Sequence, residues 1–192
     1  TNQPYGFTKN LASNRAIATG IGFSPQMQKT DDLERLSAEV GVALQARRMM
    51  LVSAESCTGG GIGEAITRTA GSSAWFERGF VTYANQAKQE MLGVRAGTLD
   101  VFGAVSEQTA REMALGALAA SHAHMAVSVT GIAGPEGGTT GKPVGTVCFC
   151  WASREGAIKT ETCHFSGGRA EVRRQAIIHV LQGVIELSAG NP

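Results

Sequence analysis

Apolar residues recur along this chain at two spacings, which predict alternating helices and strands. Leu33, Leu36, Val40 and Leu44 lie three or four residues apart, so we predict a helix that is capped near Thr30 and runs to about residue 47. Helical spacing returns over residues 62–69, 84–92, 106–120 and 169–187.

Short apolar and β-branched runs between these segments predict strands. They cover residues 49–54, 76–83, 125–129, 144–152 and 157–165, and the turn Arg154-Glu155-Gly156 joins the last two as a hairpin. Strands that alternate with helices, followed by a hairpin, predict an α/β fold: a single three-layer α/β/α domain with a mixed sheet.

Residues 1–29 differ from the rest of the chain. They are rich in Asn, Gly, Ser and Thr and show no sustained period. We interpret them as an extension, either a flexible arm or a leader, and expect the folded domain to span residues 30–189. An arm that packs on a partner subunit is the functional alternative.

Net charge and hydropathy indicate which classes of binding partner the chain is suited to. Seventeen basic and sixteen acidic residues leave a net charge of +1, which argues against nucleic acid as the main partner, although a local basic cluster could still hold one phosphate. No apolar run reaches the ~18–20 residues of a membrane span, and no signal sequence opens the chain. We therefore expect no membrane association and a cytoplasmic protein.

Cysteines and histidines show no recognisable metal-binding spacing. The cysteines are Cys57, Cys148, Cys150 and Cys163, and the histidines are His122, His124, His164 and His179. Zinc sites usually need Cys/His pairs at characteristic spacings, so we expect reduced, mostly buried thiols, histidines with surface or packing roles, and no metal.

A polar, glycine-rich loop, Glu55–Gly61, follows the first predicted strand and precedes a helix. Such a helix start directs free N–H groups at an anion or an oxyanion. Ser56, Cys57 and Thr58 are three candidate nucleophiles in a row. A plain helix-capping turn is the alternative, because the loop matches neither a nucleotide-binding P-loop nor the G-x-S-x-G elbow.

Two further features are candidates for binding. The loop Thr130–Gly138 would expose backbone amides, or would serve only as a tight surface turn. Arg169, Arg173 and Arg174 begin the last predicted helix, where an arginine fork suits a phosphate and a solvated face is the alternative. Since consecutive helical residues point about 100° apart, only one of the last two shares a face with Arg169.

Several motifs in order resemble one known family. They are AESCTGG at 54–60, AGSSAWFERGFVTYANQAK at 70–88, GAVS at 103–106, TGIAGP at 130–135, KPVGTV at 142–147 and FSG at 165–167. This pattern resembles the CinA C-terminal domain family over about residues 33–187.

The resemblance implies an amidohydrolase that converts nicotinamide mononucleotide into nicotinate mononucleotide and ammonia, in pyridine nucleotide recycling. It implies Ser56 as the nucleophile and Lys88 as the general base, which requires the pKa of Lys88 to fall towards neutrality. Tyr83 would orient Lys88, act as a second acid or serve as a core aromatic. Cys57 is interpreted as a packing residue beside the nucleophile.

The remaining expected roles concern the transition state and the substrate. The loop residues assigned to the oxyanion are Cys57, Thr58, Gly59 and Gly60. The substrate-binding residues are Glu55, Asn85, Thr130, Gly131 and Gly134, with Arg173 or Arg174 for the phosphate. The family resemblance implies no cofactor, and we expect a homo-oligomer, a dimer by default.

Two other functions remain open at this point. The same Ser–Lys pair would serve an amidase with a different small substrate. A non-catalytic nucleotide-binding module, associated with competence and DNA damage, is the second alternative, although such a module has no need of a serine–lysine pair.

Overall fold

The computed structural model describes residues 32–189. Its elements are α1 (Asp32–Ala46), β1 (Leu51–Glu55), α2 (Gly61–Thr67), a short 3₁₀ helix η1 (Ser72–Ala74), β2 (Phe76–Val81), α3 (Asn85–Leu92), α4 (Ala96–Phe102), α5 (Glu107–Ala119), β3 (Met125–Gly131), β4 (Thr146–Ser153), β5 (Ile158–His164) and α6 (Arg169–Ala189). The predicted extension 1–29 and the helix cap at Thr30 lie outside the described residues.

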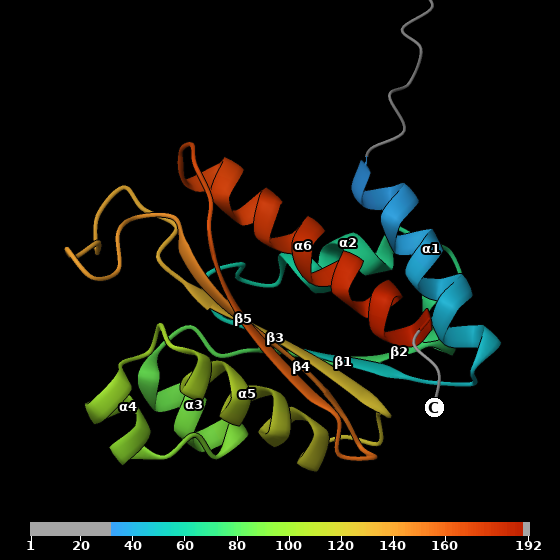
Figure 1. The fold of residues 1–192 in the computed structure, drawn as a ribbon. Coiled ribbons are helices and arrows are strands. Elements are labelled where there is room, and N and C mark those ends of the chain that lie inside the picture. The colour runs from blue at the N-terminus through green and yellow to red at the C-terminus, as the bar shows by residue number, and fades with distance from the viewer. Residues whose placement is uncertain (1–31, 190–192) are drawn as a thin grey trace, which may run out of the picture.

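The five strands form one mixed sheet in the order β2-β1-β3-β4-β5. β1 runs parallel to both β2 and β3, whereas β4 is antiparallel to β3 and to β5. In Figure 1, α1, α2 and α6 cover one face of the sheet, and α3, α4 and α5 cover the other. The predicted three-layer α/β/α fold with a mixed sheet is therefore confirmed.

Successive residues of β1 contribute to the hydrophobic cores on opposite faces of the sheet. Leu51 packs into the layer formed with α1, α2 and α6, and Val52 packs into the layer formed with α5. The indole of Trp151 on β4 donates to the Val180 carbonyl at 2.9 Å and lies against Gly183, which fixes α6 on the sheet.

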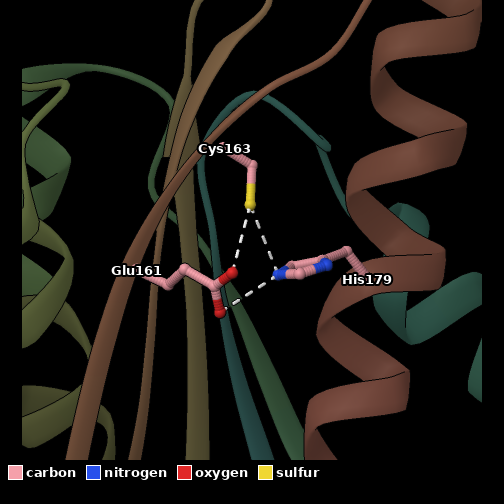
Figure 2. A group of neighbouring side chains, drawn as sticks. All are labelled: Glu161, Cys163 and His179. Atoms are coloured by element: carbon pink, nitrogen blue, oxygen red, sulfur yellow. Dashed lines mark hydrogen bonds and ion pairs between the residues drawn. The ribbon is translucent and has the colours of Figure 1, made fainter.

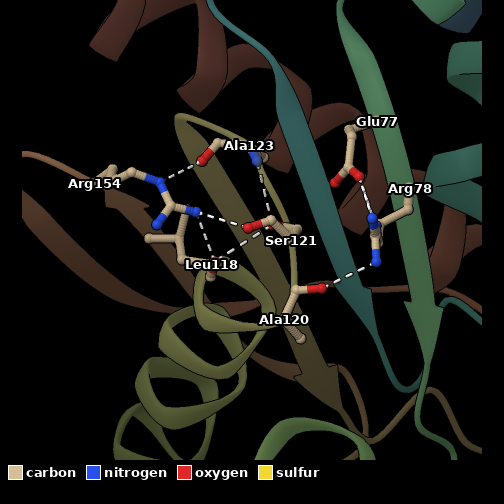
Figure 3. A network of polar contacts seen from close by, with 7 residues as sticks. All are labelled: Glu77, Arg78, Leu118, Ala120, Ser121, Ala123 and Arg154. Atoms are coloured by element: carbon tan, nitrogen blue, oxygen red, sulfur yellow. Dashed lines mark hydrogen bonds and ion pairs between the residues drawn. The ribbon is translucent and has the colours of Figure 1, made fainter.

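The end of α5 is held by two arginines (Figure 3). Arg154, in the predicted hairpin turn between β4 and β5, donates to the carbonyl oxygens of Leu118, Ser121 and Ala123 at 2.7–2.9 Å. Arg78 on β2 donates to Ala120 O at 3.0 Å. Cations suit the unpaired carbonyls at a helix C-terminus, so these contacts tie the hairpin and β2 to α5.

The sequence missed one helix. α4 has Val101 74% exposed and Phe102 42% exposed, so its apolar residues show no buried stripe that a periodicity could reveal. β4 begins at Thr146, two residues later than predicted. Within residues 32–189, no helix has the length and apolarity that crossing a membrane requires.

Candidate active site

The loop after β1 is shaped by two glycines and one buried carboxylate. Gly59 and Gly60 have φ values of 58° and 95°, the left-handed conformation that glycine adopts without steric strain. They turn the chain sharply from β1 into α2, so that Ser56 lies between the strand end and the helix start.

Glu55 holds the start of α2. Its Oε2 accepts from the Thr58 hydroxyl at 2.7 Å and from the Gly60 and Ile62 N–H groups at 3.0 Å, and its Oε1 accepts from Gly63 N–H at 3.0 Å. The side chain is 1% exposed. A carboxylate matches the partial positive charge of a helix N-terminus. Glu55, predicted to bind substrate, therefore has its carboxylate occupied by the loop and helix that carry the candidate nucleophile.

Lys88 contacts Ser56 from the segment that follows β2, the strand next to β1. It lies on α3, which follows β2, and its Nζ is 3.1 Å from Ser56 Oγ. Nζ also donates to Thr82 O at 2.8 Å and to Tyr83 O at 3.4 Å. Lys88 is 1% exposed, and this burial lowers its pKa below the usual lysine value.

These three contacts fit a protonated amine that donates to all three oxygens, and they also fit a neutral amine. A neutral lysine has two N–H donors and one lone pair. The carbonyl oxygens of Thr82 and Tyr83 can only accept, so they take the two N–H groups. The lone pair is left for the Ser56 O–H, which is the arrangement a general base requires.

A pocket of about 220 Å³ opens onto this pair. Its lining residues are Ser56, Cys57, Tyr83, Asn85, Lys88, Ala104, Val105, Thr130, Gly131, Ala133 and Arg169. The lining contains no carboxylate and none of the histidines. Its basic side chains are Lys88 and Arg169, and the guanidinium of Arg169 suits a substrate with an anionic end.

The three arginines of α6, one of which was expected to meet the phosphate, have different partners. Arg169 lines the pocket and donates to Gly134 O at 2.9 Å and to the Tyr83 hydroxyl at 2.6 Å. Arg173 donates to Thr58 O at 2.7 Å, beneath the loop. Arg174 points away to Asp32, at 3.0 Å. Neither Arg173 nor Arg174 is among the lining residues, since Arg173 is engaged with Thr58 and Arg174 with Asp32.

Two of the four residues predicted to hold the oxyanion have backbone N–H groups that donate elsewhere. Gly59 N–H donates to Ser56 O at 3.0 Å, and Gly60 N–H donates to Glu55. Within residues 32–189, no other residue accepts a hydrogen bond from the N–H of Cys57 or Thr58. These two N–H groups, directly after Ser56, are the ones available to an oxyanion.

The alternative nucleophiles are less suited than Ser56. Burial raises the pKa of the Cys57 thiol to about 12, so it stays protonated, and the Thr58 hydroxyl is fully buried and bonded to Glu55. The packing role expected of Cys57 agrees with its place in the core around α2 and α6.

The other predicted substrate contacts divide into two groups. Asn85, Thr130 and Gly131 line the pocket, whereas Gly134 contacts it only through its carbonyl bond to Arg169. Tyr83 reaches Lys88 with its backbone oxygen, while its hydroxyl faces Arg169.

Sequence reasoning missed the loop at Ala104 and Val105, which lines the pocket as well. The Thr130 hydroxyl donates to Ala104 O at 2.7 Å and so joins the two loops. The signal that could have found it is the motif GAVS at 103–106, whose small residues follow α4 directly.

Comparison with known proteins places this architecture in a family. The sequence profile of the CinA C-terminal domain matches residues 33–188. The chain belongs to the CinA C-terminal domain family. A relative from Enterobacter agglomerans named nicotinamide-nucleotide amidohydrolase PncC is 57% identical over 150 residues, which are 78% of this chain and 92% of that protein.

Two further proteins are similar to this chain, one in sequence and one in structure. A "putative competence-damage inducible protein" from Symbiobacterium thermophilum is 50% identical over 78% of this chain, but that stretch is only 37% of the longer protein. The crystal structure of competence/damage inducible protein CihA from Agrobacterium tumefaciens superposes with a TM-score of 0.80 at 47% identity, over 81% of this chain and 95% of that one.

Proposed function

We propose that this protein is a nicotinamide-nucleotide amidohydrolase, which converts nicotinamide mononucleotide and water into nicotinate mononucleotide and ammonia. The observation that carries the proposal is the 3.1 Å contact between Lys88 Nζ and Ser56 Oγ, with two backbone carbonyls on the remaining sides of the amine. The substrate class is supported by the name of the relative at 57% identity.

In the first half-reaction, Ser56 Oγ attacks the carboxamide carbon as Lys88 accepts the hydroxyl proton. The oxyanion accepts hydrogen bonds from the N–H groups of Cys57 and Thr58. The C–N bond then breaks, and Lys88 returns the proton to the leaving nitrogen, which departs as ammonia. An ester joins the substrate acyl group to Ser56.

In the second half-reaction, Lys88 takes a proton from a water molecule that attacks this ester, and Ser56 recovers its proton as the acid leaves. The substrate assists both steps. Its pyridinium charge disfavours a protonated Lys88 close by and makes the carbonyl carbon more electrophilic.

Arg169 is the residue suited to the phosphate. Two of its five N–H groups serve Gly134 O and Tyr83 Oη, so three remain for phosphate oxygens. The carboxamide lies at the buried end of the pocket beside Ser56, and the phosphate lies at the exposed end beside Arg169. Asn85, Thr130 and Gly131 flank the nicotinamide ring and ribose between them.

The test is ammonia release from nicotinamide mononucleotide by the wild type, Ser56→Ala and Ser73→Ala. Ser73 is exposed on η1 and outside the pocket, which makes it a matched serine control. We expect Ser56→Ala to lose more than about 10³-fold in kcat and Ser73→Ala to keep wild-type turnover. Normal turnover by Ser56→Ala would contradict the assignment of the nucleophile.

A substrate panel separates this function from its alternatives. Faster release from nicotinamide or another small amide than from the mononucleotide would establish an amidase of different specificity. If folded wild type binds the mononucleotide by calorimetry but releases no ammonia, the protein is a nucleotide-binding module, a role that the competence-related names of its relatives leave room for.

A further inference from the structure

Three potential metal ligands from two elements meet outside the pocket. Glu161 and Cys163 lie two residues apart on β5 and so face the same side of the sheet, where His179 of α6 meets them (Figure 2). Their ligand atoms all lie within 4.8 Å of one another. All three side chains are partly exposed, which leaves a path for an ion from solvent.

The distances within the cluster are close to the edges of a tetrahedral zinc site, with Cys163 and His179 contacting different oxygens of Glu161. Cys163 Sγ is 3.5 Å from His179 Nε2 and 3.5 Å from Glu161 Oε1, and His179 Nε2 is 3.4 Å from Glu161 Oε2. Tetrahedral zinc with ordinary Zn–S, Zn–N and Zn–O bonds requires S–N, S–O and N–O edges of about 3.6, 3.5 and 3.3 Å. A small rotation of the carboxylate is enough for one of its oxygens to meet both other ligands.

The histidine is already oriented for this role. Its ring packs against Phe149, Trp151 and Phe165, with ring centroids 4.7, 5.8 and 6.0 Å away. A ring fixed by its neighbours loses little freedom when it binds an ion.

We propose that Glu161, Cys163 and His179 form a binding site for a borderline-soft divalent cation, zinc in the first place, with water as the fourth ligand. A thiolate and a carboxylate balance the charge of the ion, and sulfur and imidazole favour zinc over magnesium or calcium. Binding releases the thiol proton to solvent, bonds to the ion replace the contacts among the three side chains, and no electron is transferred.

The site is separate from the proposed catalytic pair. His179 lies ten residues after Arg169 on α6, about 15 Å along the helix axis. A bound ion would cross-link the edge strand β5 to the middle of α6, the helix whose first turns carry the pocket arginine. The inference does not depend on the amidase activity.

Lys159 is the competing cation. Its Nζ is 3.5 Å from Glu161 Oε2 and 3.8 Å from Glu186 Oε2. Since the lysine side chain is 43% exposed, it can keep its second partner when an ion takes the first. We therefore expect Lys159→Gln to bind zinc more tightly than the wild type.

The experiment titrates the intact protein with Co²⁺ alone, followed by absorption, and with Zn²⁺ alone, followed by calorimetry. We expect one ion per chain and a thiolate-to-cobalt charge-transfer band for the wild type. Cys163→Ser should lose the band, and Glu161→Gln should weaken zinc binding at least about tenfold. His122→Gln, which removes an exposed histidine elsewhere, should bind as the wild type does.

Two results would overturn the proposal. One is the absence of saturable zinc or cobalt binding at micromolar concentrations, which would mean that the three side chains only bind one another. The other is wild-type affinity in both Cys163→Ser and Glu161→Gln. Circular dichroism of each variant verifies its fold, and Glu161 lies on an edge strand where substitution is tolerated.

Discussion

The buried carboxylate of Glu55 offers a decisive test of how the site is built. In Glu55→Gln the side chain keeps its size, but only one of its two terminal atoms can still accept. The best placement puts the amide oxygen where Oε2 receives Thr58, Gly60 and Ile62. The amide NH₂ then faces the N–H of Gly63, which loses its acceptor.

The magnitude follows from these contacts. A buried backbone N–H left without an acceptor costs about 1–3 kcal/mol, and the anion removed from a partly buried helix start costs up to about 2 kcal/mol. The lower desolvation penalty of the neutral amide offsets a part of this sum. We expect Glu55→Gln to lower the free energy of unfolding by about 3 kcal/mol.

The assay is urea unfolding of Glu55→Gln beside Glu64→Gln. Glu64 lies on α2, the helix whose start Glu55 holds, but its side chain is 59% exposed and pairs with Arg68, so its loss should cost less than about 1 kcal/mol. Below the unfolding transition, we expect Glu55→Gln to lower kcat, because the loop that carries Ser56 loses its anchor. Unchanged stability together with a higher KM for the mononucleotide would refute this reasoning and return Glu55 to the role of a substrate contact.

Three further predictions concern the base, the phosphate contact and the packing of α6. Lys88→Met should lower kcat about 10²–10⁴-fold. It should also raise the free energy of unfolding at neutral pH, because the pKa of Lys88 is lower in the folded protein than in the unfolded chain. The wild type therefore gains stability as pH rises to about 10.5, and in urea unfolding the advantage of the variant should disappear at that pH. Arg169→Met should raise KM about tenfold or more for the mononucleotide and leave KM for nicotinamide riboside unchanged; equal effects on both substrates would exclude a phosphate contact. Gly183→Ala should destabilise the protein by about 1–3 kcal/mol in thermal unfolding, because the new methyl would lie 2.4 Å from the Trp151 ring. In the same assay, Gly97→Ala on α4 should not destabilise the protein, since the added carbon meets open space.

Much of the fold could be predicted from the sequence because burial was periodic. The inner strands β1 and β3 are buried along nearly their whole length, and Leu33, Leu36, Val40 and Leu44 all face the core at helical spacing. Helix α4 was not predicted because its apolar residue Val101 is exposed, so its apolar positions do not mark a buried face.

The site was less predictable, for physical reasons. Ser56 and Lys88 are 32 residues apart, and only a family resemblance, not their spacing, paired them. Helical phase placed Arg169 and Arg173 on one face of α6, but phase cannot tell which of them reaches a pocket and which lies under a loop. The proposed zinc ligands come from β5 and α6, which are separate in sequence, so no local Cys/His spacing predicts them.

The parallel half of the mixed sheet explains why the chemistry lies where it does. Ser56 follows β1, Lys88 follows β2 on α3, and Thr130 lies near the end of β3, so three parallel strands deliver their groups to the carboxyl edge of the sheet. β1 pairs with both neighbours, and a slip of one residue between β1 and β2 would move the strands by about 3.3 Å and reverse the faces of their side chains. That displacement is as large as the whole Lys88–Ser56 contact. The base therefore meets the nucleophile only because strand register, set by burial on both faces of β1, is fixed to a single residue.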